Sequence, residues 1–463
     1  MPAIVTKDFR VHNARQFSES FSESADTYYL GIGRPQAFAN DQAFNDGTDT
    51  SPPTPVDSVG SVEYYVYDDL LSAKKVTSSD VSLVIPRRNW TTGTVYDYYR
   101  HDYGEINSAG NAITTDSGAS ALLDGLIYVM NSTFDVYKVI DNNGGAASTT
   151  EPTGNKTTSV FSTADSYKWK YMYSLTASEQ ANFMSTDFIH VSTNASDIST
   201  TAGAIEHVKV TAGGSGGSNG TYTNVDIRGD GSSGKCTVVV GSNAVTSVTI
   251  TTAGSGYTYA SVKASDIGNV SGADIDFIIS PPGGHGSDAI AELGGFFVMM
   301  NVDFTQGDGS GDFNTTNDFR RIALLRNPTD STTGSTATAT TLDGTKSITF
   351  SGTPGSFQAD EKITQATSGA VGFVVDFNST TKVLRYIQPQ FTNQGVDSNG
   401  NLTAFSSTNT VTGATSSATG TPSSHDTTPE LTADTGDILY IENRKPITRA
   451  SDQTENVKLI VEF

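Results

Sequence analysis

The sequence predicts a mainly β fold: an α+β core with a discontinuous β-sheet or sandwich and a few helices, plus two small inserted β-rich lobes. Only 17% of the 463 residues are charged, and Gly (45 residues), Ser, Thr and Asn take the place of the missing charge, as in β-structure with many tight turns. The 22 Phe and 19 Tyr supply enough apolar area for burial to argue against disorder. The local amino-acid composition also changes abruptly along the chain, which indicates several structural parts.

Aromatic and mixed-charge sequence forms three separated stretches, and two stretches rich in Gly, Ser and Thr interrupt them. The predicted core therefore comprises 1–202, 281–330 and 429–463. The predicted lobes are 203–280, a β-repeat, and 331–428, a β lobe with a linker. Insertions of this length are tolerated because the entropy of loop closure grows only logarithmically with loop length.

The core is expected to contain three helices among its strands. Apolar residues recur at helical spacing over 8–23 and 117–130, which predicts two amphipathic helices. A third, short helix begins at Thr176, because Glu179 three residues on completes a capping box. Core strands are expected at 3–5, 61–67, 128–140, 167–173, 296–300 and 319–325.

The first lobe contains an internal repeat. A β-type run at 208–211 is followed by a Gly-Ser-Gly turn at 214–216, and a similar run at 248–251 is followed by the same turn at 254–256. Each copy is predicted to be one small β-unit, because glycine at such turns adopts positive φ without steric cost.

The remaining sequence reads as further strands. Val457, Leu459, Val461 and Phe463 alternate on one face, as in a half-buried strand. The run 437–463 is predicted to form a β-hairpin, two strands joined by a polar turn, that closes a sheet begun near the start of the chain. The low-complexity stretch 408–428 is expected to be a mobile linker. Strand candidates in the second lobe are 347–350, 370–377 and 382–387.

The charge balance limits the partners. Lys and Arg number 28 and Asp and Glu number 50, giving a net charge of −22 without a dense basic block, so neither nucleic acid nor an anionic membrane is an expected partner. Cys236, the only cysteine, precedes an apolar run and is predicted to be a buried structural thiol. The first residues lack the apolar core of a secretory signal, so synthesis in the cytoplasm is expected.

Two loops offer candidate chemistry. His285 lies next to Ser287 and Asp288, but catalytic triads are built from residues far apart in sequence, so a turn-forming histidine is the prediction. Asp308 and Asp312 place oxygen ligands in a Gly-rich loop that lacks the bidentate Glu of a calcium site, and a surface turn is predicted. No catalytic residue, metal site or cofactor is therefore expected.

The candidate subunit interface lies where cations accompany tryptophan. Arg87 and Arg88 precede Trp90, and Trp and Arg are enriched where protein partners dock. The alternative is that Trp90 is a core residue whose flanking charges are solvated. Two interpretations likewise stay open for Arg444 and Arg449: an ion pair with a carboxylate of the same chain, or a contact with another subunit.

Several widely separated runs resemble the baseplate wedge proteins of T-even-like contractile-tailed phages. The resemblance falls on the predicted core and not on the lobes. The runs are Ala3 to Arg10, Tyr29 to Arg34, Asp57 to Val59, Val84 to Trp90, Asp165 to Tyr171, Phe319 to Pro328 and Tyr440 to Phe463.

The resemblance implies a non-enzymatic structural subunit in the virion, at the tail baseplate. It implies contacts with other baseplate wedge subunits and allows a homodimer. Two alternatives stay open: a host-surface adhesin whose lobes bind saccharide, and a polysaccharide-degrading tail enzyme, which would need two carboxylates facing one cleft.

Overall fold

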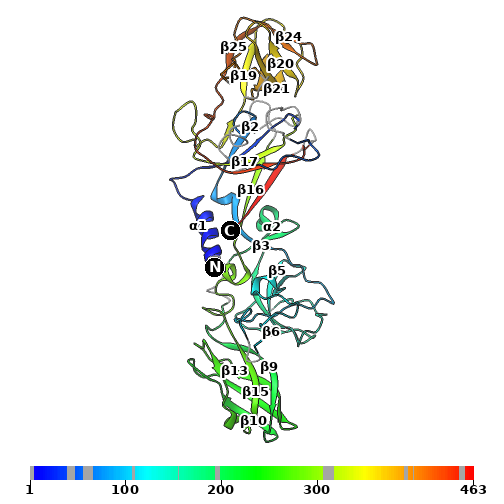
Figure 1. The fold of residues 1–463 in the computed structure, drawn as a ribbon, viewed down its shortest axis with the longest axis vertical. Coiled ribbons are helices and arrows are strands. Elements are labelled where there is room, and N and C mark those ends of the chain that lie inside the picture. The colour runs from blue at the N-terminus through cyan, green and yellow to red at the C-terminus, as the bar shows by residue number, and fades with distance from the viewer. Residues whose placement is uncertain are drawn as a thin grey trace. The chain divides into compact units, whose positions relative to one another are not determined.

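A computed structural model describes residues 5–38, 47–55, 66–106, 110–154, 156–192, 199–305, 317–389, 395–399, 401–447 and 454–463. The chain forms two compact units (Figure 1). The first unit comprises Met1–Phe17, Ser82–Met299 and Ile460–Phe463, and the second comprises Ser18–Val81 and Met300–Leu459. The predicted mainly β class is confirmed. The division into one core and two lobes, with the bounds given above, stays a prediction.

The first unit is built around a sheet of aromatic strands. Strands β4 (Tyr128–Met130), β5 (Asp135–Asp141), β7 (Lys168–Ser174) and β6 (Phe161–Ser162) lie in that order, and the pairs are antiparallel. Both faces of β5 and β7 are buried, and the buried positions include the charged residues Asp135, Lys138 and Lys170 as well as apolar and aromatic ones. Among the described residues of this unit, three α-helices also begin: α1 (Lys7–Ser20), α2 (Ala177–Phe183) and α4 (Ala289–Leu293).

Another four-stranded sheet has the order β27-β16-β3-β8. Its strands are β27 (Glu455–Glu462), β16 (Phe297–Phe304), β3 (Val81–Pro86) and β8 (Phe188–His190). The division between the units falls within α1, β16 and β27. At the end of β27, the Arg10 guanidinium on α1 contacts both the Glu462 carboxylate and the carbonyl of Phe463, so the C-terminus lies beside α1 (Figure 1).

Residues of the predicted first lobe form their own hydrophobic cluster, drawn from 205–279. In β12 (Lys235–Gly241) burial alternates, so Cys236 points inward as predicted, and burial raises the pKa of its thiol to about 11. The two ends of this segment meet: Ser280 N–H donates to the carbonyl of Ala204 at 2.9 Å. The other strands are β9 (Ile205–Ser215), β10 (Gly220–Asp226), β11 (Arg228–Gly229), β13 (Ala244–Thr252), β14 (Ala260–Ser261) and β15 (Ser271–Ile279).

Two of the described sheets lie wholly within the second unit. The five-stranded sheet has the order β18 (Thr341–Asp343), β2 (Leu70–Val76), β1 (Tyr28–Gly33), β17 (Arg321–Arg326) and β26 (Asp437–Asn443). The seven-stranded sheet has the order β24 (Thr419–Gly420), β23 (Val411–Gly413), β20 (Lys362–Gln365), β21 (Ala370–Asn378), β22 (Val383–Ile387), β19 (Lys346–Phe350) and β25 (Pro422–Asp426).

Most predicted elements are confirmed and two are wrong. The stretch 117–130 is not an α-helix: it contains a single 3₁₀ turn, Leu122–Asp124, and β4, because Tyr128, Val129 and Met130 pair with β5. The stretch 408–428 is not a linker, since β23, β24 and β25 are paired parts of the seven-stranded sheet.

The remaining sequence predictions can be judged only in part. The closing strands β26 and β27 are both present, and β26 joins the sheet that contains β1, but the two belong to different sheets and do not form a hairpin. Most of the strands predicted at 3–5 and 61–67 lies outside the described residues.

The repeated Gly-Ser-Gly turns give a test of the repeat. Gly214 and Gly254 have φ of +70° and +67°, and a Cβ at either would lie within 2.6 Å of a backbone oxygen. Gly216 and Gly256 both have φ of +73°, but a Cβ there would meet nothing within 4 Å. We therefore expect Ala at Gly256 to cost about 1 kcal/mol through backbone strain alone, and Ala at Gly254 to cost more.

Hydrogen exchange on peptides from 203–280 measures this difference. Exchange should accelerate more in Gly254→Ala than in Gly256→Ala. In the other copy of the repeat, exchange should likewise accelerate more in Gly214→Ala than in Gly216→Ala. Equal effects within a pair would contradict the role assigned to the close backbone approach.

Candidate functional site

The predicted interface residues of the first unit follow β3 and are engaged within the unit. Arg87 donates to the carbonyl of Ser185 at 3.0 Å. Arg88 donates to the carbonyls of Gly125 and Leu123, and its guanidinium lies 4.8 Å from the ring centroid of Tyr128. Both arginines are half-buried, so each presents part of its side chain to solvent.

The tryptophans are core residues to different degrees. Trp90 is half-buried against the aromatic cluster of the first unit, and its indole N–H donates to Ser148 Oγ at 3.1 Å. Trp169 is fully buried and stacks on Tyr167, with ring centroids 5.5 Å apart. The charges flanking Trp169 are not all solvated, because Lys170 is completely buried.

The remaining predicted interface residues belong to the second unit. Arg444 follows β26 and is half-buried, and its backbone N–H donates to the carbonyl of Arg320 at 2.8 Å. Arg449 lies outside the described residues. The structure therefore brings Arg87, Arg88 and Trp90 together after one strand, and their role as a subunit interface stays a prediction.

Arg88 borders a cavity of about 700 Å³, which we call the Arg88 pocket. Side chains from α1, from the turn Leu122–Asp124, from the start of β16 and from the end of β27 line it. The residues that matter below are Lys7, Arg10, Arg88, Tyr128, Phe296 and Glu462.

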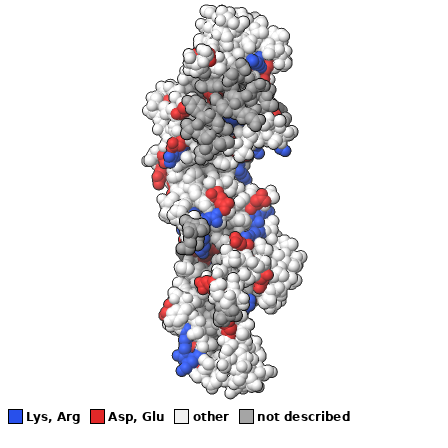
Figure 2. Space-filling view, in the orientation of Figure 1, with Lys and Arg blue, Asp and Glu red and all other residues white. Residues whose placement is uncertain are grey.

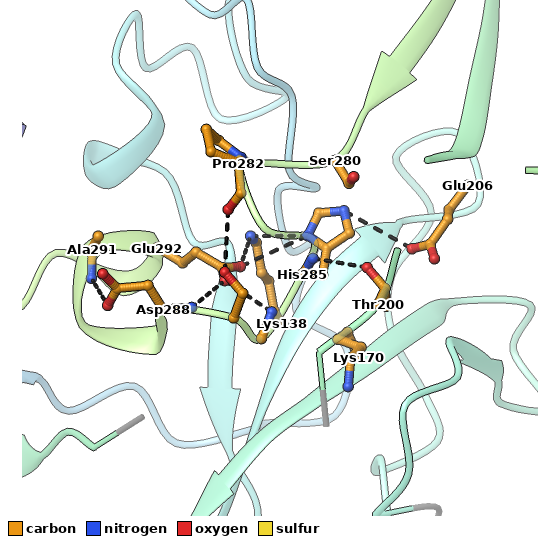
Figure 3. A network of polar contacts seen from close by, with 12 residues as sticks. Lys138, Lys170, Thr200, Glu206, Ser280, Pro282, His285, Asp288, Ala291 and Glu292 are labelled. Atoms are coloured by element: carbon orange, nitrogen blue, oxygen red, sulfur yellow. Dashed lines mark hydrogen bonds and ion pairs between the residues drawn. The ribbon is translucent and has the colours of Figure 1, made fainter. Parts of the chain in front are cut away.

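His285 belongs to a buried polar network of the first unit, shown in Figure 3. Lys138 on β5 donates to His285 Nδ1 at 3.1 Å and to Glu292 Oε2 at 2.6 Å. The other edge of the imidazole faces Glu206 on β9, with Nε2 and Oε2 4.0 Å apart. The backbone N–H of His285 donates to Thr200 Oγ1 at 2.8 Å. His285 therefore lies in a turn, as predicted, but its side chain is buried and bonded within the network.

Burial and neighbouring charges together set the pKa values in this network. Burial, with a further contribution from the Lys138 ammonium, lowers the pKa of His285 to about 4, so the imidazole is neutral at pH 7. Burial alone would raise the pKa of Glu292, but Lys138 and His285 outweigh it and lower the pKa to about 2. Burial raises the pKa of Glu206 to about 7, because its Oε2 has no hydrogen-bond partner in the described structure. Burial also lowers the pKa of Lys170 to about 8.

The network is not arranged as a nucleophilic catalytic site. Ser287 Oγ donates to the carbonyl of Pro282 at 3.1 Å, and no hydrogen bond joins it to His285 in the described part of the chain. Asp288 caps α4 and pairs with Arg15 at 2.6 Å. Triad catalysis requires the base to bond the nucleophile, and here Lys138 occupies the acceptor nitrogen of His285.

The second candidate loop, with Asp308 and Asp312, lies outside the described residues. Among the residues that are described, no cluster of three or more His, Cys, Asp or Glu side chains could hold a metal ion. A search of the same residues found no helix with both the length and the apolar character needed to cross a membrane.

Sequence reasoning missed Lys138, Glu206 and Glu292. A signal was available for one of them: Lys138 stands in the apolar run of β5, where a solvated cation does not fit. The sequence around its partner Glu292 gives no comparable signal of burial, because α4 is a five-residue helix whose packing the local sequence does not reveal.

Comparison with known proteins bears on the two ends of the chain. A family model described as "Bacteriophage T4, Gp8" matches residues 3–148 and 390–463. The resemblance to the baseplate wedge family is confirmed. Of the seven runs quoted above, five lie within the matched residues, including those on β1, β3, β26 and β27. The runs Asp165 to Tyr171 and Phe319 to Pro328 lie outside the match.

A curated relative gives the same result. The chain is 26% identical over 205 residues to "Baseplate wedge protein gp8" of Enterobacteria phage T4. The match spans 41% of this chain and 60% of the length of that relative. The family model leaves 149–389 unmatched, which contains the predicted first lobe and part of the second.

Proposed function

We propose that the chain is a structural subunit of a contractile-tail baseplate wedge and joins neighbouring wedge proteins in the virion. The observation that carries the proposal is the ordered match to the Gp8 family at both ends of the chain, 3–148 and 390–463. The buried network supports a structural role, since Lys138 and Glu292 neutralise each other and leave no paired nucleophile and base. We propose, as the resemblance to the wedge family implies, that this subunit is not an enzyme.

The surface composition agrees with assembly between proteins. On the face drawn in Figure 2, uncharged residues cover most of the described surface, and acidic and basic side chains are interspersed. Nucleic-acid binding needs a continuous basic stripe, which the described residues on that face do not form. The partners proposed are other wedge subunits, and a second copy of the chain is an additional candidate.

We also propose that 1–202, 281–330 and 429–463 form the part that enters the wedge, with 203–280 and 331–428 as appendages. The candidate contact residues in that part are Arg87, Arg88, Trp90, Arg444 and Arg449. Neither the saccharide-binding adhesin nor the polysaccharide-degrading enzyme is favoured by a specific contact or by the comparisons.

The test is genetic and structural. A phage whose gene for this chain is interrupted is expected to accumulate incomplete tails, and supply of the chain in trans is expected to restore contraction-competent tails. Labelled chain should then lie at the baseplate in electron micrographs of purified tails. Complete tails without the chain, or label elsewhere on the virion, would reject the proposal. A glycan-array screen and a turnover assay on host-wall polysaccharide test the two alternatives.

A further inference from the structure

The Arg88 pocket combines an apolar floor with a cationic rim. Its floor includes Tyr128 and Phe296, both buried, and Leu293 beside them. Its volume of about 700 Å³ falls in the range of about 300–1,000 Å³ in which protein pockets enclose ligands. On α1, between the lining residues Lys7 and Arg10, Phe9 is 54% exposed.

The charge at the rim is only partly neutralised within the unit. Arg10 pairs with Glu462, and its guanidinium lies 3.6 Å from the ring centroid of Phe296. Arg88 bonds only backbone carbonyls and a tyrosine ring among the described residues, so no carboxylate offsets its charge. Lys7 is exposed, and the described structure gives it no ion pair.

His101 adds a hydrogen-bond donor to the same rim. The backbone N–H of Ile279 donates to His101 Nδ1 at 3.3 Å, which leaves the ring proton on Nε2. The exposed imidazole can therefore donate to an acceptor even when neutral. Asp124 is the other carboxylate on the described lining besides Glu462.

Because the chain has a net charge of −22, a local excess of positive charge marks this pocket as a place where an acidic peptide can bind. The net negative charge of the chain disfavours an acidic peptide in general, whereas the pocket offers it two cations without carboxylate partners and a donor over an aromatic floor. We propose that the Arg88 pocket docks a peptide segment of a neighbouring subunit in which carboxylates flank an aromatic or branched apolar side chain. The apolar side chain fills the floor, and the carboxylates bond Arg88 and Lys7. This inference rests on the proposed function, because it names the contact through which the chain joins a neighbour.

The probe for the test is a fluorescently labelled peptide with the core Glu-Phe-Asp-Leu, and its control has the core Gln-Phe-Asn-Leu. Binding to the full chain is measured by fluorescence anisotropy. The acidic peptide is expected to bind about tenfold or more tightly than its amide control, and added salt should weaken only the acidic peptide.

Variants localise the binding. Arg88→Gln should weaken the acidic peptide about tenfold, and Lys7→Gln less, because Lys7 is more exposed. Arg87→Gln is the matched control, since Arg87 follows the same strand but bonds Ser185 and does not line the pocket. If Arg88→Gln unfolds the turn Leu122–Asp124, the exposed Lys7→Gln variant still reports on the pocket.

Three results would overturn the inference: no binding of the acidic peptide, equal affinity for both peptides, or equal losses in Arg87→Gln and Arg88→Gln. The tail experiment separates this failure from failure of the proposed function. If the chain reaches the baseplate but does not bind the peptide, the pocket proposal is rejected and the proposed function stands. If the chain is absent from tails, the proposed function itself is rejected.

Discussion

Replacing Glu292 by leucine is expected to destabilise the first unit by about 3–5 kcal/mol. The substitution leaves the Lys138 ammonium, which is completely buried, without its carboxylate 2.6 Å away. It also removes the acceptor of the Gly286 N–H, which donates to Glu292 Oε1 at 2.8 Å. Urea unfolding followed by tryptophan fluorescence measures the loss, because both tryptophans of the chain, Trp90 and Trp169, belong to this unit.

A double variant separates the effect of the unpaired charge from the effect of altered packing. The double variant Lys138→Met with Glu292→Leu removes both charges, so we expect it to recover part of the stability lost in Glu292→Leu. Asp226→Asn is the control, since it breaks the exposed pair with Lys235 in the same unit and should have little effect. A Glu292→Leu variant within about 0.5 kcal/mol of the wild type would contradict the role assigned to the pair.

Replacing Glu206 by glutamine is expected to stabilise the protein at high pH and to change little at low pH. Burial raises the pKa of Glu206 to about 7 in the folded state, against 4.5 for an ordinary glutamate. The protonated form is therefore favoured by folding, and the stability present below pH 4.5 is lost as the pH rises through 7. One pKa unit corresponds to about 1.4 kcal/mol, so the gain above pH 7 is at most about 3 kcal/mol.

The neighbours of Glu206 require that the variant be compared with the wild type at each pH. His285 acts in the opposite sense: its folded-state pKa of about 4 is below 6.5, so its contribution is lost as the pH falls from 6.5 to 4. Lys170, Lys138 and Lys168 also act on the Glu206 carboxyl and lower its pKa. The difference in unfolding free energy between variant and wild type isolates Glu206.

The control for this pH profile is Glu105→Gln, which changes an exposed carboxylate in the same unit. It should leave the profile of the wild type unchanged. A Glu206→Gln curve that runs parallel to the wild-type curve from pH 4 to pH 8 would show that the buried carboxyl does not titrate in this window.

The sequence predicted where the strands lie better than it predicted which strands pair with each other. The alternation in β12 placed Cys236 inside, and the Gly-Ser-Gly turns marked positive φ in both copies of the repeat. These features are local, since side-chain period and glycine conformation are properties of a few residues. The pairing of β26 with β17 and of β27 with β16 is not local, and so the two closing strands were taken for a single hairpin.

The errors have identifiable physical causes. Leu122, Leu126 and Val129 have helical spacing, but Tyr128 and Val129 gain more from pairing with Tyr137 and Lys138 in the sheet. Polar, low-complexity sequence at 411–426 forms strands because the seven-stranded sheet supplies hydrogen-bond partners for its backbone.

The candidate site was the least predictable part. Arg87, Arg88 and Trp90 were recognised because tryptophan and arginine stand together in sequence. The Arg88 pocket was not, because its other walls come from α1, Phe296 and Glu462, which only the fold brings to Arg88. The same holds for Lys138 and Glu292, which are 154 residues apart.

The hydrogen bond between Ser280 and Ala204 has an evolutionary consequence. A segment whose two ends are joined in this way can change length in its outer turns while the rest of the first unit keeps its fold. It cannot be lost without cost, because His207 and Asp276 pair with Asp141 and Arg100. Length variation among related sequences should therefore concentrate in the turns between Ala204 and Ser280 that make no such contact.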